Sequence, residues 1–415
     1  MIKKIILIIK ILFLVKKKFR MPKKNRVVLY RYDGKELLDK YIKENISILD
    51  PFNEIYLIVL IKSLLDFSFK NILLNYNKTF ISMTKPKFVF TYIDNDLKFY
   101  FLKDFFKKIK FISIQNGYRG GINDKKYKND YIDSMEEFNL KVSKIHSLKC
   151  DFILTFNKDV SKKYNKFIKA KTLVIGSIKS NIFKIKEYKN KNILSFICES
   201  AMNQEYAFDQ KVYFDNNKYK ITLNDWLLAE KKIIPYLAEY CEKKNFKFQI
   251  ITKGNSKYEK VFYKNLIKDK FKYTIITKKN RLQGYELVDK SNYIVSIGSS
   301  LAYEALSRKK KVAFLPIRKE ILKNKGFNLD FSQYDFGWPS KFRQKGFFWT
   351  HFNNTGEFNR VLNFITNISD KKWLKLINGF NNSFKIPHNS NNTVFVNFLK
   401  ILKIKVWQTK YSYQR

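Results

Sequence analysis

The sequence is short of the residue types that build disulfide frameworks, metal sites and flexible linkers. Its 415 residues include 3 cysteines, 3 histidines, 7 prolines and 13 glycines. Cys150, Cys198 and Cys241 form no CxxC pair, and the histidines form no HExxH motif. This scarcity argues against a disulfide-stapled fold and a zinc site, and it indicates a reducing compartment such as the cytoplasm.

Long apolar runs are missing as well. The most apolar stretch, Ile5–Val15, is eleven residues long and carries Lys10 in its middle. As a helix it would extend about 16 Å, against about 30 Å of hydrocarbon, so it is too short to span a bilayer. Lysines flank it, and we expect residues 1–20 to lie on an anionic membrane surface. Two other interpretations stay open: the segment packs on the protein's own body, or translation starts at Met21.

Acidic residues are few in comparison with basic ones. Lys and Arg number 82 against 36 Asp and Glu, which gives a formal net charge of +46. Such an excess suggests an anionic partner, either nucleic acid or an acidic membrane. The lysines are nevertheless dispersed along the whole chain, as codons rich in A and T would produce. Because no RRM, KH or zinc-finger signature is present, we expect no nucleic-acid partner.

What the sequence does contain is a regular alternation of short apolar strands and helical stretches. We expect strands at residues 26–32, 87–93, 109–114, 151–156, 172–175, 193–197, 246–252, 273–277, 292–297 and 311–316. Such alternation predicts an α/β fold with parallel sheets and helices on both faces. The pattern restarts after a polar connector at residues 187–192, so it predicts two Rossmann-like domains with strand ends facing a central cleft.

The sharpest local pattern is YIVSIGSSLAYEAL at residues 293–306, a strand that ends in a glycine and runs into a helix. Ser299 or Ser300 can cap this helix, whose first N–H groups and positive dipole end can hold a phosphate. Gly298 lets the backbone approach a ligand, and Glu304 can accept hydrogen bonds from a ribose or sugar hydroxyl. Alternatively, the same sequence is compatible with a well-capped helix that carries an ordinary surface glutamate and binds no ligand.

This motif, followed by KVAFLP at residues 311–316, resembles the donor-binding helix of GT-B glycosyltransferases. The resemblance implies that the serine pair binds a nucleotide phosphate and that the glutamate contacts the ribose. Other segments are similar to a family of bacterial surface carbohydrate biosynthesis proteins of the GT-B class: KFVFTYIDND (87–96), FISIQNGYRGG (111–121), VIGSIKSN (174–181) and FGWPSKFRQKGFFWT (336–350). The similarity spans residues 21–380.

The resemblance also assigns tasks to the predicted domains. Residues 21–188 are expected to bind the acceptor and residues 189–355 the donor, after the membrane-surface segment at residues 1–20. Residues 356–415 are expected to form helices that return to the first domain, followed by a basic tail. A polar, aromatic stretch at residues 200–222 is interpreted as an insertion over the cleft.

A transferase needs a group that takes the proton from the acceptor hydroxyl. Asp94 is the first candidate for this base and Asp33 the second, with Asn95 beside Asp94 in the cleft. Alternatively, Asp94 and Asn95 cap the helix that follows. The stretch Asp94-Asn95-Asp96 also leaves a metal site open as a minor alternative.

Other polar residues follow predicted strands and are expected to line the cleft. Amides read sugar hydroxyls and an arginine binds a carboxylate or phosphate, which is why we select Gln115, Asn116, Gly117 and Arg119. Lys253 and Arg318 are expected to neutralise the leaving phosphate in place of a metal. Glu199 either lines the cleft or forms an ion pair with a lysine.

Together these expectations describe a glycosyltransferase without a cofactor, peripheral on the cytoplasmic face of the plasma membrane. Its donor would be a UDP-, GDP- or CMP-linked sugar, and its acceptor a surface polysaccharide or a lipid-linked glycan. The paired serines also fit a CMP- or CDP-activated donor that carries an acidic sugar or glycerophosphate. A non-catalytic scaffold and a basic nucleic-acid-binding protein are the alternatives from other classes.

Overall fold

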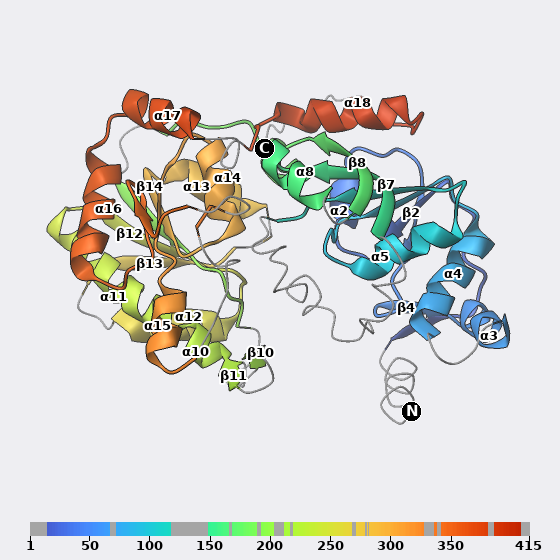
Figure 1. Cartoon of the computed structure of the whole chain (residues 1–415), viewed down its shortest axis with the longest axis horizontal. Helices are drawn as coiled ribbons and strands as arrows, with labels where there is room; N and C mark the ends of the chain where they lie inside the picture. Colours follow the sequence, from blue (N-terminus) through green and yellow to red (C-terminus); the bar gives the residue numbers. More distant parts are fainter. Residues whose placement is uncertain are drawn as a thin grey trace. The chain divides into compact units, whose positions relative to one another are not determined.

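In a computed structural model the chain forms two compact units, each with its own sheet (Figure 1). The structure describes residues 15–66, 72–117, 148–165, 168–188, 192–202, 211–215, 219–267, 271–278, 280, 282–327, 336–337, 342–380 and 386–407. The first unit contains Met1–Asn116, Lys128–Ile175 and Asn391–Arg415, and the second contains Gly117–Tyr127 and Gly176–Ser390. No helix within the described ranges has the length and apolarity needed to cross a bilayer.

The first unit is built on a six-stranded parallel sheet with the order β3-β2-β5-β6-β7-β8. Its strands are β2 (Val27–Tyr30), β3 (Ile46–Leu49), β5 (Phe88–Thr91), β6 (Lys110–Ile114), β7 (Leu148–Thr155) and β8 (Ile168–Val174). Every residue of β2 and β5 is buried, as expected for inner strands covered on both faces. The strand order reverses between these two strands.

Helices and a short second sheet complete the first unit. They are α2 (Lys35–Leu38), α3 (Leu57–Asp66), α4 (Ile72–Thr84), α5 (Leu97–Leu102), η2 (Lys103–Phe105), α8 (Lys158–Tyr164) and α18 (Thr393–Ile401), with β1 (Lys16–Lys18) paired to β4 (Glu54–Tyr56). The C-terminal helix α18 belongs here because its Phe398 ring packs on Phe152 of β7, with 5.0 Å between centroids.

The second unit has a seven-stranded sheet with the order β13-β12-β9-β14-β15-β17-β16. Its strands are β9 (Ile193–Ile197), β12 (Lys247–Ile251), β13 (Tyr273–Ile276), β14 (Tyr293–Ser296), β15 (Lys311–Phe314), β16 (Lys345–Gly346) and β17 (Trp349–Thr350). All neighbours pair in parallel except β16 and β17. The order reverses between β9 and β14, as in a doubly wound fold.

Helices and one hairpin complete the second unit. They are α9 (Ile178–Asn181), α10 (Leu223–Trp226), α11 (Leu228–Lys243), α12 (Lys257–Ile267), α13 (Gln283–Lys290), α14 (Ser300–Ser307), α15 (Arg318–Asn324), α16 (Thr355–Asn367), α17 (Asp370–Gly379) and the antiparallel pair β10 (Lys211–Asp215) and β11 (Tyr219–Thr222). A short helical turn, η6 (Ser390–Asn392), marks the point where the chain returns to the first unit. The hairpin falls within the stretch that the sequence marks as an insertion.

The predicted α/β fold of two Rossmann-like units is confirmed. The observed division lies elsewhere than the expected one: the chain changes units at Gly176, and α16 and α17 stay with the second unit. The reason is burial, since the Trp373 ring of α17 is enclosed and its Nε1 donates to Lys310 O at 3.0 Å. After α17, only residues from Asn391 onward return to the first unit.

The basic end of the expected membrane segment is a strand. Residues 1–14 lie outside the described residues, but Lys16–Lys18 form β1 and pair in parallel with Glu54–Tyr56. The Lys18 ammonium lies 2.5 Å from a Glu54 carboxylate oxygen and 5.0 Å from the centre of the Tyr56 ring. This lysine is therefore part of the fold.

A buried ion pair holds three helices of the second unit together. Arg308 directly follows α14 and is buried, and its Nε donates to Asp289 Oδ1 of α13 at 2.8 Å. The same guanidinium donates to Ser180 O of α9 at 3.1 Å. Losing one partner of a buried pair leaves the other charge uncompensated, so this contact is sensitive to substitution.

We expect Asp289→Ala to lower the free energy of unfolding of the second unit by about 3–5 kcal/mol, because Arg308 stays buried without its counter-charge. Urea unfolding followed by fluorescence measures the change. Glu286→Ala on the same helix is the control, since its pair with Lys290 is exposed and contributes about 0.5 kcal/mol at most. Equal losses in the two variants would contradict the assignment.

Candidate functional site

The turn between β14 and α14 adopts the predicted strand–glycine–helix geometry. Ser299 is the N-cap of α14, with φ −60° and ψ 134°, but its side chain makes no capping hydrogen bond. Its backbone N–H donates instead to Ser296 Oγ at 3.1 Å. Gly298 is exposed. Gly117 of the same unit lies close to Ser300, since a Cβ added to Gly117 would be 3.2 Å from Ser300 Oγ. The start of α14 is thus not closed by its N-cap side chain.

Glu199 lies at the point where the strand order of the second unit reverses. It follows β9, while Gly298 follows the neighbouring strand β14, and a Cβ on Gly298 would be 3.0 Å from Glu199 Oε1. Open α/β sheets bind their ligands outside the strand ends at such a reversal. The structure therefore brings these two candidate residues together at a position typical of ligand binding.

Arg318 is held in place by its neighbours. It is buried, and its guanidinium donates to Glu199 at 2.9 Å, to Glu230 at 3.1 Å and to Trp226 O at 3.0 Å. The guanidinium also lies over the Trp226 ring at 4.3 Å. Burial, opposed by Arg318, raises the pKa of Glu230 to about 7. With these contacts Arg318 is suited to fixing Glu199, and less suited to the phosphate contact that the sequence suggested.

Glu304 lies on the buried face of α14 and not on its exposed face. It is 3% exposed, its Oε1 accepts from Ser177 Oγ at 3.0 Å, and its Oε2 accepts from the Tyr285 hydroxyl. Burial raises the pKa of Glu304, against the hydrogen bond from Tyr285 and the charges of Lys179 and Lys253. Its carboxylate joins α14 to α13 and to the residue that caps α9.

Three lysine side chains influence one another beside α14; we call them the lysine cluster (Lys179, Lys253 and Lys278). In the parallel pair of β12 and β13, Ile251 is opposite Ile276, so Lys253 and Lys278 each follow two residues later on adjacent strands. Burial, together with the positive charges of Lys253 and Lys179, lowers the pKa of Lys278 to about 8. Lys179 belongs to α9, and such a group of like charges forms a favourable site for an anion.

A second buried carboxylate fixes the backbone of this cluster. Glu259 is buried; its Oε1 accepts from Lys253 N at 2.6 Å and its Oε2 from Gly254 N at 2.9 Å. The Lys253 side chain, in contrast, is exposed. The turn after β12 is therefore fixed at its backbone, while the ammonium group is accessible to a ligand.

In the first unit, Asp94 and Gln115 are internal. Asp94 is 0% exposed, its Oδ1 accepts from Asn116 N at 3.2 Å, and its Oδ2 accepts from the Tyr164 hydroxyl. Gln115 is also buried, and its Oε1 accepts from Phe156 N at 2.7 Å. Both side chains connect neighbouring strand-end loops, whereas Asn116 is only half-buried.

Asp33 and Asn95 are half-buried in the loops after β2 and β5. These loops meet, because a Cβ on Gly34, whose φ is 91°, would lie 2.5 Å from Tyr92 Cβ. Both residues thus lie at the strand-order reversal of the first unit. The N-cap of α5 is Asp96, so neither of the residues expected as alternative caps has that task.

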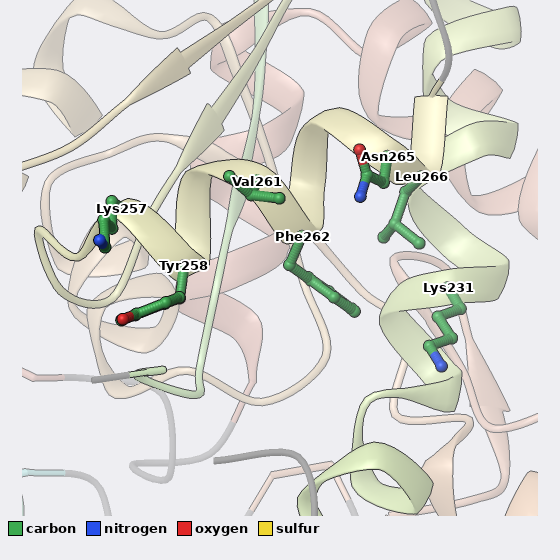
Figure 2. Close-up of a pocket in the computed structure, with 7 residues that line it drawn as sticks. All are labelled: Lys231, Lys257, Tyr258, Val261, Phe262, Asn265 and Leu266. Carbon is green, nitrogen blue, oxygen red and sulfur yellow. The ribbon is translucent and has the colours of Figure 1, made fainter. Parts of the chain in front are cut away.

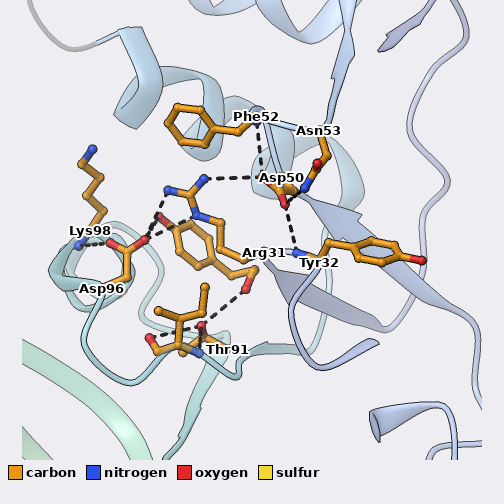
Figure 3. Close-up of polar contacts among 10 residues, drawn as sticks. Arg31, Tyr32, Asp50, Phe52, Asn53, Thr91, Asp96 and Lys98 are labelled. Carbon is orange, nitrogen blue, oxygen red and sulfur yellow. Dashed lines mark hydrogen bonds and ion pairs between the residues drawn. The ribbon is translucent and has the colours of Figure 1, made fainter. Parts of the chain in front are cut away.

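The loop that carries Asp33 is fixed by ion pairs around Arg31 (Figure 3). Arg31 has a φ of 72°, and its guanidinium nitrogens lie 3.4 Å from carboxylate oxygens of Asp50 and Asp96. Asp50 also accepts a hydrogen bond from Tyr32 N at 3.1 Å. Since Asp50 follows β3 and Asp96 follows β5, the network joins the ends of three strands.

A pocket of about 630 Å³ lies elsewhere in the second unit, along α12 (Figure 2). It is lined by Lys231, Lys257, Tyr258, Val261, Phe262, Asn265 and Leu266. Lys231 comes from α11 and the others from α12, so the pocket is a groove between two helices. None of the candidate residues from the sequence lines it, and we do not assign the site to it.

Four residues around α14 were not predicted from the sequence: Ser177, Lys179, Lys278 and Tyr285. A signal existed for three of them. Ser177 and Lys179 lie within the VIGSIKSN segment, and Lys278 stands two residues after β13, the same offset as Lys253 after β12. The candidate Arg119 lies outside the described residues.

Comparison with known proteins adds a family and a set of structural neighbours. A family model described as "putative O-antigen biosynthesis protein" matches residues 112–403, and no curated protein matches the sequence. Among similar solved structures are UDP-GlcNAc 2-epimerases from Neisseria meningitidis (15% identity, 90% of this chain and 99% of that one, TM-score 0.46) and Methanocaldococcus jannaschii (12%, 91% and 99%, 0.48). The wall teichoic acid polymerase TagF is another (11%, 97% and 94%, 0.47). At this level of similarity, none of them indicates a substrate for this chain.

The lysine cluster predicts a dependence of stability on pH. The unfolded chain holds the Lys278 proton with the ordinary pKa near 10.5, and the folded chain with a pKa of about 8. Below pH 8 Lys278 is protonated in both the folded and the unfolded state, and the folded state bears the full free-energy cost of burying the charged ammonium. This cost disappears as the pH rises from 8 to 10.5. We therefore expect Lys278→Met to raise Tm at about pH 7 and to give no gain near pH 10.5.

Lys272→Met is the matched control, because this exposed lysine precedes β13 at the opposite end of the strand. It should leave Tm unchanged at both pH values. Thermal unfolding by calorimetry or fluorescence measures the effect. A Lys278→Met variant that is less stable than wild type at about pH 7 would show that the ammonium is not a repelled member of a cluster.

Proposed function

The chain belongs to the O-antigen biosynthesis family whose model it matches over residues 112–403, and we propose that it is a glycosyltransferase of surface carbohydrate biosynthesis. It would move a sugar from a nucleotide-activated donor to a surface polysaccharide or a lipid-linked glycan. The observation that carries this proposal is the lysine cluster, in which Lys253 and Lys278 follow adjacent strands of the second unit and Lys179 belongs to α9. The cluster lies near the first turn of α14, because a Cβ on Gly284 would be 3.5 Å from Lys278 Cδ and 2.9 Å from Leu301 Cδ2. An anionic group is the natural ligand of such a place.

The chemistry follows from the charge that develops on the donor. When the bond between the anomeric carbon and the phosphate oxygen breaks, negative charge grows on the leaving phosphate. Preorganised positive groups that point to that oxygen lower the barrier. Here the first turn of α14 supplies a partial positive charge and Lys253 and Lys278 supply full ones. These residues can neutralise the leaving group as a metal ion does in other transferases.

Around this anion site, buried carboxylates act as supports. Glu259 holds the Lys253 turn and Glu304 joins α14 to its neighbours, so neither side chain is placed as a surface contact. Glu199 is the carboxylate that lies against Gly298 at the strand-order reversal. We assign it the contact with donor hydroxyls that the sequence suggested for Glu304, because a partly exposed carboxylate can accept such hydrogen bonds.

On the acceptor side, Asp33 replaces Asp94 as the preferred general base. The Asp94 carboxylate is 0% exposed and already accepts hydrogen bonds from Asn116 N and the Tyr164 hydroxyl. Asp33 is half-buried on a loop that the Arg31 network fixes and that meets the loop after β5. A base needs access to the hydroxyl that it deprotonates, and Asp33 offers that access.

The alternative donor is a CMP- or CDP-activated group, an acidic sugar or glycerophosphate. The exposed Gly298 and the serines at the start of α14 do not select one nucleobase of the donor over another, since a helix start of this kind contacts only the phosphate. A non-catalytic scaffold would keep the fold but would bind none of these nucleotides, so its Tm would not respond to them.

We expect at least one of UDP, GDP, CDP and CMP to raise the Tm of the full chain. A nucleotide at about 100 times its dissociation constant stabilises the folded state by about 2.7 kcal/mol, which a thermal-shift assay detects. Lys278→Met and Lys253→Met should each reduce that shift, whereas the control Lys272→Met should preserve it. The absence of a shift with all four nucleotides would contradict the proposal.

The two candidate bases are separated by measuring turnover and stability together. We expect Asp33→Asn to reduce release of nucleotide from its sugar donor by about 100-fold or more with an unchanged Tm. Asp94→Asn should instead lower the free energy of unfolding by about 1–3 kcal/mol, because its buried partners lose an acceptor. If Asp94→Asn abolished turnover at an unchanged Tm, the base would be Asp94.

A further inference from the structure

Helix α3 (Leu57–Asp66) is apolar on the side that faces away from the core of the first unit. Val59 and Ser63 are buried, but Ile58, Ile61 and Leu65 are 39%, 55% and 80% exposed. The spacing of these three residues places them on one helical face. Monomeric soluble proteins rarely expose a row of large aliphatic side chains, so this face is a candidate for an interaction surface.

Exposed basic side chains border this face. Strand β1 pairs with β4 so that Lys18 is opposite Tyr56, and Leu57, the next residue along the chain, is the first of α3. The chain that leaves β1 therefore starts beside the N-terminal end of α3. Within α3 itself, Lys62 is exposed next to Ile61. The exposed residues around β1 and directly after it are Lys16, Lys17, Phe19, Arg20, Met21, Lys23 and Lys24.

We propose that the α3 face, defined by Ile58, Ile61, Lys62 and Leu65 with the exposed residues 19–21 beside it, docks on an anionic membrane surface. A bilayer offers acyl chains to the aliphatic side chains and anionic headgroups to the neighbouring lysines and arginine at the same time. Phe19 and Met21, which are 81% and 59% exposed, add apolar contacts between basic residues. The combination of apolar row and basic border is what a headgroup region accommodates.

Charge distinguishes this occupant from a second copy of the chain. A symmetric dimer through the α3 face would bring the Lys62 residues and the basic border of both copies together, and like charges repel. The sequence of α3 contains one acid, Asp66, and it stands at the last position of the helix. The α3 face is therefore better suited to an anionic membrane surface than to the same face of a second copy of the chain.

The proposal does not depend on the transferase chemistry, because it concerns the first unit alone and uses none of the donor-site residues. It would keep the enzyme on the membrane that carries a lipid-linked acceptor. Since the residues involved are exposed, they can be replaced without emptying a core. Binding and folding can thus be measured separately.

The test is co-sedimentation of the full chain with vesicles of phosphatidylcholine and phosphatidylglycerol, and with vesicles of phosphatidylcholine alone. We expect binding to the anionic vesicles that weakens at high salt, and little binding to the neutral ones. Ile61→Glu and Leu65→Glu should each reduce the apparent affinity about tenfold or more, because a carboxylate then faces the headgroups. Val261→Glu, at an exposed valine of α12 in the second unit, is the matched control and should bind as wild type.

Three results would overturn the proposal. One is unchanged vesicle binding by Ile61→Glu and Leu65→Glu. The second is a marked fall of Tm in both variants, which would show that the face is covered by the chain itself. The third is a wild-type dimer in sedimentation velocity that Leu65→Glu converts to a monomer. The nucleotide-induced shift in Tm should stay the same in all these variants, so failure here is distinguishable from failure of the proposed function.

Discussion

Parallel pairing of strands is the constraint on which both units depend. When neighbouring strands run in the same direction, their carboxyl ends meet at one edge, and residues far apart in the chain become neighbours there. The register of Ile251 with Ile276 puts Lys253 beside Lys278, and the register of Ser296 with Ile197 puts Gly298 beside Glu199. No local interaction would bring these residues together. The candidate donor site is a consequence of the sheet.

Four buried carboxylates have visible structural tasks. Glu259 accepts from two backbone N–H groups, Glu304 from two hydroxyls, Asp94 from a backbone N–H and a hydroxyl, and Asp289 from Arg308. Each of these buried carboxylates fixes a strand-end loop or a helix by its hydrogen bonds. Basic side chains far outnumber acidic ones, and in the second unit Lys253 and Lys278 at two strand ends and Lys179 of α9 form the lysine cluster.

Sequence patterns predicted ten strands of the two large sheets but not β3, β16 and β17, and they were insufficient for the contacts. The strands, the turn at Gly298 and the helix beginning at Ser300 follow from local apolar runs and turn residues, and the structure has them. The direction of a side chain at a strand end depends on partners from other elements. Asp94 points inward because Tyr164 of α8 donates to it, and Glu304 does so because Tyr285 of α13 donates to it. Neither partner is near in sequence, so both carboxylates looked accessible.

The lysine cluster connects stability with binding in a way that a merely structural role would not require. Without an anion, Lys278 is partly desolvated by burial and is also repelled by Lys253 and Lys179, so the folded state holds its proton less tightly than the unfolded state does. An anion among the three ammonium groups would reverse that balance, because opposite charges favour the protonated form. The same interaction would then both raise the affinity for the ligand and remove the loss of folding free energy that the charged Lys278 causes.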